Sequence, residues 1–151
     1  MSLNRKMLSI CFLALTIFSI FALSYTLYIV LETSRVLRFL EVSLSDVTIK
    51  ENGSEAYFHL VICNPSTISL KVFFYETKIY FNDNYVDERK GHPTFQGEPL
   101  PLPSYAKTNL NITLSLNNQT SYSDGVWKLN LRFILETPLP QRGGYTTILE
   151  K

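Results

Sequence analysis

Hydrophobic and polar residues follow two different patterns along this chain of 151 residues. The 25 residues from Met7 to Leu31 include no charged side chain, whereas beyond residue 40 apolar and polar residues alternate in short runs. As a helix, the first segment would extend about 37 Å, and the hydrocarbon core of a bilayer is about 30 Å thick. It therefore predicts a transmembrane helix over 7–31, after a short cytoplasmic N-terminus over 1–6.

A cleavable signal peptide is the competing interpretation of the apolar segment. Residues 22–24, Ala-Leu-Ser, offer small side chains at a cleavage-site spacing behind the basic residues Arg5 and Lys6. The apolar region of a signal peptide usually spans about 7 to 15 residues, and this one continues to Leu31. We therefore expect an uncleaved signal anchor, followed by a stalk over 32–40.

The orientation of the helix depends on the basic residues at its two ends. Arg5 and Lys6 precede it and Arg35 and Arg38 follow it, so a count of Lys and Arg is close to a tie. The amino terminus adds positive charge to the first side. We therefore expect a single-pass protein of the cell membrane, with its N-terminus inside and the remaining chain extracytoplasmic.

Three N-glycosylation sequons are consistent with export of the C-terminal part. They begin at Asn52, Asn111 and Asn118. With ten Asn and 27 Ser plus Thr in the chain, roughly two such triplets arise by chance. The sequons therefore indicate candidate glycosylation sites and do not establish a glycoprotein.

Beyond residue 40 the hydrophobic pattern has a period of two, which is typical of β-strands. Val42 and Leu44 alternate with serines, and Val47 and Ile49 continue in the opposite phase after Asp46, which predicts a β-bulge. In a later run Ile68, Leu70, Val72 and Phe74 are expected on one face. The further predicted strands cover 56–63, 68–74 with its continuation over 78–81, 85–89, 109–116, 126–135 and 145–149, with a turn at 82–84 and a loop or edge segment at 91–105.

These runs amount to about seven strands in roughly 110 residues, separated by turn signals. Such spacing is typical of an all-β domain with an immunoglobulin- or fibronectin-III-like β-sandwich fold. We expect one such domain over 41–151, preceded by the single N-terminal transmembrane helix.

Asn64 and Pro65 interrupt the chain between two apolar runs. Proline cannot donate a ladder hydrogen bond, and it biases the preceding residue away from helical backbone. The Asn64 side chain is suited to capping exposed backbone groups at such a break. We interpret the pair as a structural corner rather than a binding site.

The residues around this corner resemble a known family. The strand ending in Asn64-Pro65, the segment ISLKVFFYETKIYFNDNYV and the stretch LPLPSYAKTNLNITLSL resemble the LEA14/WHy family, the group-2 late-embryogenesis-abundant (LEA) domains, over roughly 41–135. The resemblance implies an immunoglobulin- or fibronectin-III-like sandwich with Asn64 and Pro65 at the corner between two strands. It also implies a role in desiccation and stress protection or in membrane-localised interaction.

The charge after the apolar segment argues against nucleic acid as a partner. After Leu31 the chain has 12 basic and 13 acidic residues, a net charge of −1. Nucleic-acid binding depends on a basic surface that neutralises phosphates. We therefore expect the lipid bilayer and other proteins, including integral membrane subunits, as partners, and we leave the oligomeric state open.

Candidate catalytic and metal-binding residues are few. His59 and His92 are 33 residues apart, Cys11 lies in the apolar segment and Cys63 at a strand end, so these four residues do not suggest a clustered metal site or a disulfide framework. The acidic stretch 82–88 lacks the spacing of a calcium loop. We therefore predict no catalytic residue, no metal site and no cofactor, and expect that the protein is not an enzyme.

Three functions fit these observations. The first is a membrane-anchored, non-enzymatic interaction module, LEA14-like and related to stress. The second is a cofactor-free accessory subunit of a respiratory or transport complex. The third is an archaeal pilin-like filament subunit, which is disfavoured because Met7, rather than a small residue, follows Lys6.

Overall fold

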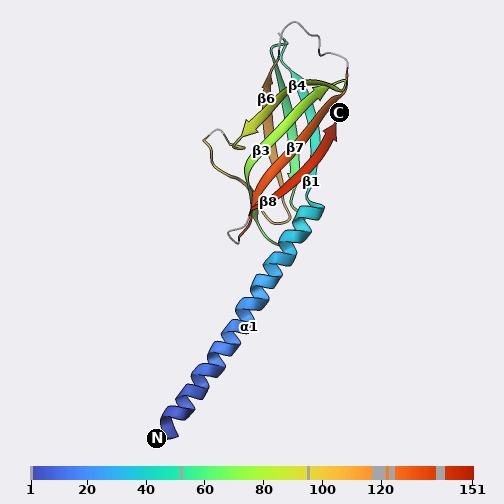
Figure 1. Cartoon of the computed structure of the whole chain (residues 1–151). Coiled ribbons are helices and arrows are strands. Elements are labelled where there is room, and N and C mark those ends of the chain that lie inside the picture. The colour runs from blue at the N-terminus through green and yellow to red at the C-terminus, as the bar shows by residue number, and fades with distance from the viewer. Residues whose placement is uncertain (1, 52, 95, 117–121, 123–124, 139–141) are drawn as a thin grey trace.

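The computed structural model describes residues 2–51, 53–94, 96–116, 122, 125–138 and 142–151. In these ranges one long helix is followed by eight β-strands (Figure 1). The elements are α1 (Ser2–Phe39), β1 (Glu41–Ile49), β2 (Glu55–Cys63), β3 (Leu70–Phe81), β4 (Asn84–Gly91), β5 (Leu100–Leu102), β6 (Lys107–Ser115), β7 (Trp127–Glu136) and β8 (Arg142–Glu150).

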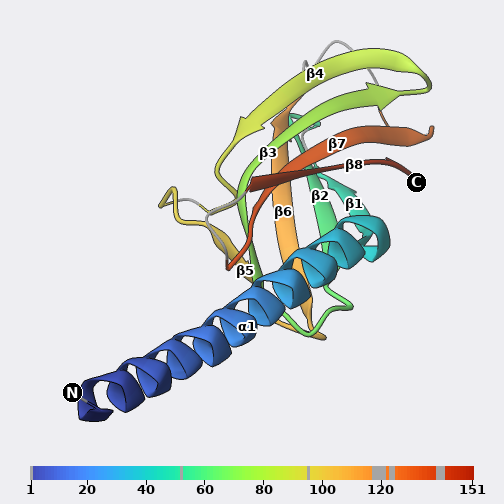
Figure 2. The same cartoon turned by 60° about the horizontal axis from the view of Figure 1, so that its bottom comes forward.

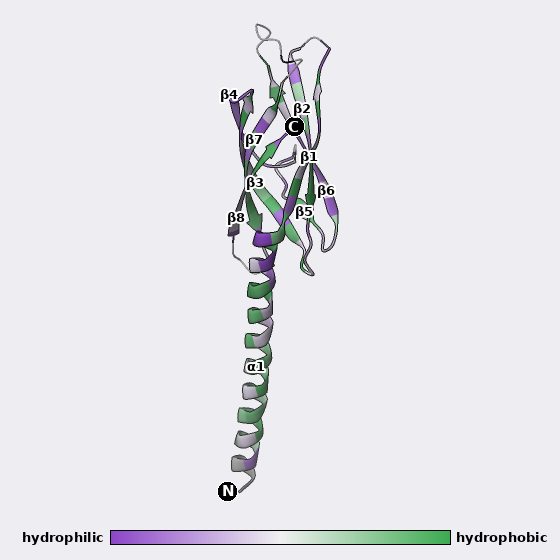
Figure 3. Cartoon of the chain, turned by 90° about the vertical axis from the view of Figure 1, so that its right-hand side faces the viewer, coloured by the Kyte–Doolittle hydropathy of each residue, from purple (hydrophilic) through white to green (hydrophobic). Residues whose placement is uncertain are grey.

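Helix α1 is continuous over 38 residues, which corresponds to about 57 Å. Hydrophobic residues, coloured green in Figure 3, occur along most of its length. The hydroxyls of Thr16, Ser19 and Thr26 each donate to the carbonyl four residues earlier, so these polar groups are satisfied within the helix. Such a long apolar N-terminal helix fits a single-pass membrane anchor or a signal sequence.

The strands form two antiparallel sheets, as the alternation predicts. One sheet has the order β1-β2-β6, and the other has the order β4-β3-β7-β8 with β5 paired to β3. Figure 2 shows the two sheets from the end at which α1 lies. This arrangement confirms the predicted immunoglobulin/fibronectin-III-like sandwich.

The eighth strand, β5, lies inside the Pro-rich segment that was expected as a loop or edge. Its three residues pair with Leu70–Val72 of β3, and Pro101 lies opposite Lys71. A proline is tolerated here because an edge strand needs ladder bonds on one side only. The structure therefore contains one strand more than the alternation indicates.

Two β-bulges set which side chains face the core. The bulge in β1, between Leu44 and Asp46, confirms the predicted change of phase. A second bulge lies between Val72 and Phe74 in β3. It places Phe74 opposite the half-buried Ile134 and Tyr75 opposite the buried Phe133, so the prediction that Phe74 shares a face with Val72 is wrong.

The core lies between the inner faces of the two sheets. Phe58 of β2 meets Trp127 of β7 edge to face, with 5.2 Å between ring centroids, and Phe81 contacts the same tryptophan. Burying one large apolar side chain contributes about 1.5–3 kcal/mol. The largest fully buried side chains are Phe58, Leu60, Ile62, Ile79, Leu102, Leu110, Ile112, Leu114, Leu129, Leu131, Phe133 and Leu135.

Candidate functional site: the junction of helix and sandwich

Asn64 is a buried polar residue directly after β2. Its Nδ2 group donates to the carbonyls of Ile68 at 2.9 Å, Leu102 at 3.0 Å and Pro103 at 3.1 Å. Its Oδ1 atom accepts from the backbone N–H and the hydroxyl of Ser66, at 3.1 and 2.8 Å. One side chain thereby satisfies several backbone groups that have no strand partner.

These hydrogen bonds join two turns at the same end of the sandwich. The turn at 64–69 connects β2 to β3 across the two sheets, and the turn at 103–106 connects β5 to β6. Backbone bonds strengthen the link, from the Asn64 N–H to the Ala106 carbonyl at 3.0 Å and from the Tyr105 N–H to the Ser66 carbonyl at 3.2 Å. The corner expected at Asn64 and Pro65 therefore lies where the chain passes between the sheets.

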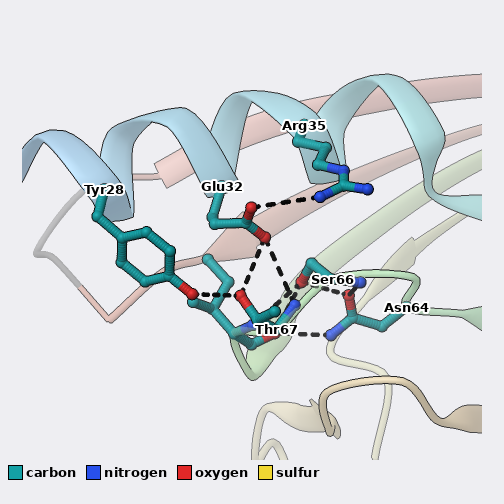
Figure 4. A network of polar contacts seen from close by, with 7 residues as sticks. Tyr28, Glu32, Arg35, Asn64, Ser66 and Thr67 are labelled. Carbon is teal, nitrogen blue, oxygen red and sulfur yellow. Dashed lines mark hydrogen bonds and ion pairs between the residues drawn. The ribbon is translucent and has the colours of Figure 1, made fainter.

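Thr67, on the outer side of this turn, contacts α1 (Figure 4). Its hydroxyl donates to the Glu32 carboxylate at 3.0 Å, and its backbone N–H lies 3.5 Å from the same oxygen. The Tyr28 hydroxyl lies 2.5 Å from Thr67 Oγ1, and because the threonine proton points to Glu32, Tyr28 is the donor. Arg35 pairs with the other Glu32 oxygen at 3.5 Å.

Apolar contacts complete the junction. Ile29, Val36 and Leu40 of the helix side belong to the buried core cluster. Leu37 lies close to Gly143, at which an added Cβ would be 3.2 Å from the leucine methyls, and the Tyr145 hydroxyl donates to the Leu40 carbonyl at 2.8 Å. Residues 32–40, expected as a stalk, are thus helical to Phe39 and lie against the sandwich.

Of the three candidate glycosylation sites, Asn111 lies within the described residues, whereas Asn52 and Asn118 lie outside them. Asn111 is exposed on β6, opposite His59 of β2, and its Oδ1 atom is 3.0 Å from His59 Nδ1. Both side chains line a shallow hollow of about 390 Å³ on the outer face of the β1-β2-β6 sheet. The remaining lining residues are Ser45, Asp46, Leu60 and Asn109.

The outer face of the larger sheet has a different chemical character. Lys90 pairs with Glu76 at 2.8 Å and with Glu88, and Arg132 lies 3.8 Å from Glu76. The hydrogen bond from Lys90 lowers the pKa of Glu76, and the bonds to Glu76 and Glu88 raise the pKa of Lys90. This face therefore presents a connected network of ion pairs, whereas the opposite sheet has separate pairs, Lys50 with Glu55 and Lys151 with Asp46.

The other candidate residues lie apart from one another. His92 Nδ1 is 2.9 Å from the Phe73 carbonyl, Cys11 is exposed on α1, and Cys63 is half-buried at the end of β2. Within the described ranges no three His, Cys, Asp or Glu side chains form a group that could hold a metal ion.

Sequence reasoning did not identify the contacts of Tyr28, Glu32 and Thr67. The sequence predicts only that Tyr28 lies in the apolar segment and that Glu32 is the first residue of the stalk. The available signal was weak, because Glu32 is simply the first charged residue after the apolar segment. Its partner Thr67 is 35 positions away, so the contact depends on the tertiary fold.

The fold is similar to those of several solved structures. One is a suspected late-embryogenesis-abundant protein, with a TM-score of 0.53, 10% identity, and coverage of 90% of this chain and 86% of that one. Another, from Arabidopsis thaliana, has a TM-score of 0.51, 17% identity, and coverage of 74% and 78%. A third is a suspected ApaA protein from Bordetella pertussis, with a TM-score of 0.55, 10% identity, and coverage of 74% and 92%.

No protein-family model and no curated protein matches the sequence. At such low identities the structural likeness concerns the fold alone. The chain therefore has a β-sandwich similar in fold to these structures, attached to a long apolar helix.

Proposed function

We propose that this protein is a membrane-anchored, non-enzymatic interaction module of the LEA14/WHy type. Helix α1 would be the anchor, with its N-terminus inside, and the sandwich would act by contact on the extracytoplasmic side. The observation that carries this proposal is the division of α1 into two parts. The side chains from Lys6 to Tyr28 are exposed, and the buried side chains of the helix occur from Ile29 onward, where the sandwich begins.

The docked end of the helix favours an anchor over a removable leader. Tyr28, Ile29, Glu32, Val36 and Leu37 all contact the sandwich or its core cluster. Cleavage near residues 22–24 would leave this docked part in place but would separate it from the exposed apolar part. An uncleaved, continuous helix instead holds the sandwich at a fixed distance from the bilayer.

The LEA14-like assignment is supported by the fold and by the corner. The sandwich resembles that of a suspected LEA protein. The hydrogen bonds of Asn64 fit the corner between two strands that the family resemblance implies. A role in stress protection follows from that resemblance by analogy.

Interaction by contact is supported by the two outer sheet faces. One has a shallow hollow, lined mainly by uncharged side chains, around His59 and Asn111, and the other has a network of ion pairs around Glu76 and Lys90. Two faces of such different chemistry suit protein partners that recognise one face and not the other.

The test is to extract the full chain from native membranes in mild detergent, measure its intact mass and identify the proteins that co-purify. We expect an uncleaved chain, with or without glycan mass, together with specific protein partners. Stoichiometric polytopic partners would define the module as an accessory subunit. A chain shortened at residue 7 or 8 and recovered from sheared filaments would contradict the proposal and indicate a pilin.

A further inference from the structure

The junction places one end of the sandwich level with the end of the apolar segment. Ile29 belongs to that segment, yet only 3% of its surface is exposed because the sandwich covers it. Thr67 bonds to Tyr28 and Glu32, which lie one helical turn apart. The turn at 64–69 therefore lies at the height of residues 28–32 of the helix (Figure 4).

The height of the membrane boundary follows from the length of the helix. About 20 helical residues cross the hydrocarbon core, so a span that starts after Lys6 ends near Thr26. The headgroup region adds about 5–7 Å on each side, or roughly four more residues at about 1.5 Å each. Residues 27–30, and the turn beside them, therefore fall within the headgroup region.

We propose that the helix-side rim of the sandwich lies in the lipid headgroup layer and binds headgroup phosphates. The rim is defined as the turns 65–69 and 103–106 together with Lys71, Lys107, Glu136, Thr137, Pro138 and Arg142. This inference rests on the proposed membrane anchor and specifies how the sandwich is oriented on its own membrane.

The chemistry of the rim fits a headgroup layer. Lys71, Lys107 and Arg142 are exposed cations, and Ser69 adds an exposed hydroxyl group. Phosphate oxygens accept hydrogen bonds from all of these groups. Tyr105, at the tip of the second turn, is 69% exposed, and tyrosine is enriched at membrane interfaces because its ring is apolar and its hydroxyl is polar.

A hollow of about 390 Å³ on the rim offers a seat for one headgroup. Ser69, Lys71, Glu136, Thr137 and Pro138 line it, and Lys71 lies directly opposite Glu136 on the neighbouring strand. A phosphate beside Lys71 and an amine beside Glu136 would match this pair. The hollow thus suits a zwitterionic headgroup such as phosphoethanolamine.

The proposal can be tested by measuring the depth of spin labels in the full chain. The protein is placed in nanodiscs of phosphatidylcholine and phosphatidylethanolamine with a small fraction of lipid carrying a gadolinium chelate as headgroup. Cys11→Ala and Cys63→Ala remove the native thiols. Single labels are then introduced with Ser69→Cys at the rim, Lys50→Cys at the far end of β1, and Ile17→Cys within the apolar helix.

We expect the Ser69 label to relax several-fold faster with the gadolinium lipid than without it, and the Lys50 label to change little. The nine residues of β1 separate the two levels by about 30 Å, and dipolar relaxation decreases steeply with distance. Lys107→Cys provides a second rim site if the Ser69 variant does not fold.

Two other outcomes would contradict different parts of the proposal. In the first, the Ile17 label is accessible to oxygen and protected from water, but the rim labels relax like the Lys50 label. This result would support the membrane anchor and would show that the rim lies outside the headgroup layer. If the Ile17 label is accessible to water, the membrane anchor itself is wrong.

Discussion

Asn64 connects three parts of the molecule through one amide group. Its Nδ2 group donates to carbonyls of the β2–β3 turn and of the end of β5, and its Oδ1 atom accepts from the Ser66 hydroxyl. Because these groups are buried, water cannot replace the amide without opening the corner. The residue is thus a fixed point of the backbone at the end of the sandwich that faces α1.

Replacing Asn64 by alanine should lower the free energy of unfolding by about 3 kcal/mol. The estimate takes the upper end of the range of about 1–3 kcal/mol for leaving a buried polar group without its partner, because the bonds of one amide are lost together and do not simply add. Urea denaturation of the full chain in detergent measures the change. Asn109→Ala, at an exposed position of β6, is the matched control and should change stability by less than about 0.5 kcal/mol.

At the scale of elements, the junction holds α1 and the sandwich together by polar contacts on one side and apolar contacts on the other. Thr67 meets Tyr28 and Glu32, whereas Leu37 and Leu40 lie beside β8. Two separate groups of contacts restrain both the tilt and the rotation of the helix. Weakening one group should therefore change the relative motion more than the stability of either element.

Thr67→Val should broaden the distribution of distances between α1 and the sandwich. Valine keeps the shape of threonine but removes the hydroxyl that bonds to Tyr28 and Glu32. Spin labels are introduced with Ser24→Cys and Lys50→Cys in a chain that lacks the thiols of Cys11 and Cys63. Pulsed electron–electron double resonance between the two labels measures the width of the distance distribution. Thr48→Val, at an exposed site of β1, is the control. An unchanged width would mean that the apolar contacts alone fix the junction.

The ion pairs of the larger sheet give an acid-sensitive contribution to stability. The pKa of Glu76 is lowered in the folded chain, chiefly by the hydrogen bond from Lys90. A carboxylate with a lowered pKa contributes stability above its unfolded pKa of about 4.3, and this contribution is lost as the pH falls through the folded pKa. Glu76→Gln should therefore flatten the loss of stability below about pH 4.5, as measured by urea denaturation across pH. A slope identical to that of the unmodified chain would contradict this role for Glu76.

The elements with a long period-two pattern were predictable, because one face of each is buried in the core. Strand β5 was not, since three residues including Pro101 cannot establish a period. The bulge in β3 was also hidden, because Phe73, Phe74 and Tyr75 are all aromatic and the change of phase does not alter the pattern. The corner at Asn64 followed from local chemistry, whereas its link to α1 depends on contacts between distant residues.

At the scale of the whole molecule, the proposed orientation in the membrane decides which surfaces can be modified. Asn111 is exposed on β6, and its sequon is available only if the sandwich enters the secretory compartment. The same face contains Asn109, which is outside any sequon. These two residues form a natural pair for testing the orientation.

In a glycosylating host, the variant with Asn52 and Asn118 both changed to Gln should retain a glycosidase-sensitive mobility shift. Adding Asn111→Gln should abolish the shift, whereas adding Asn109→Gln should leave it. The measurement is gel mobility of the membrane fraction before and after glycosidase treatment. Absence of the shift in the presence of Asn111, from a chain that is folded and inserted, would contradict an extracytoplasmic sandwich.

The contacts between Thr67 and Glu32 and between Tyr145 and Leu40 couple the azimuth of the sandwich to that of α1. If α1 spans the membrane as proposed, it can turn about its own axis in the lipid, and this domain must turn with it. A neighbouring membrane helix that packs against one stripe of α1 would thereby select which of the two sheets points towards the neighbour's own domain. Packing between helices within the bilayer would then determine which sheet face of the sandwich meets the neighbouring domain.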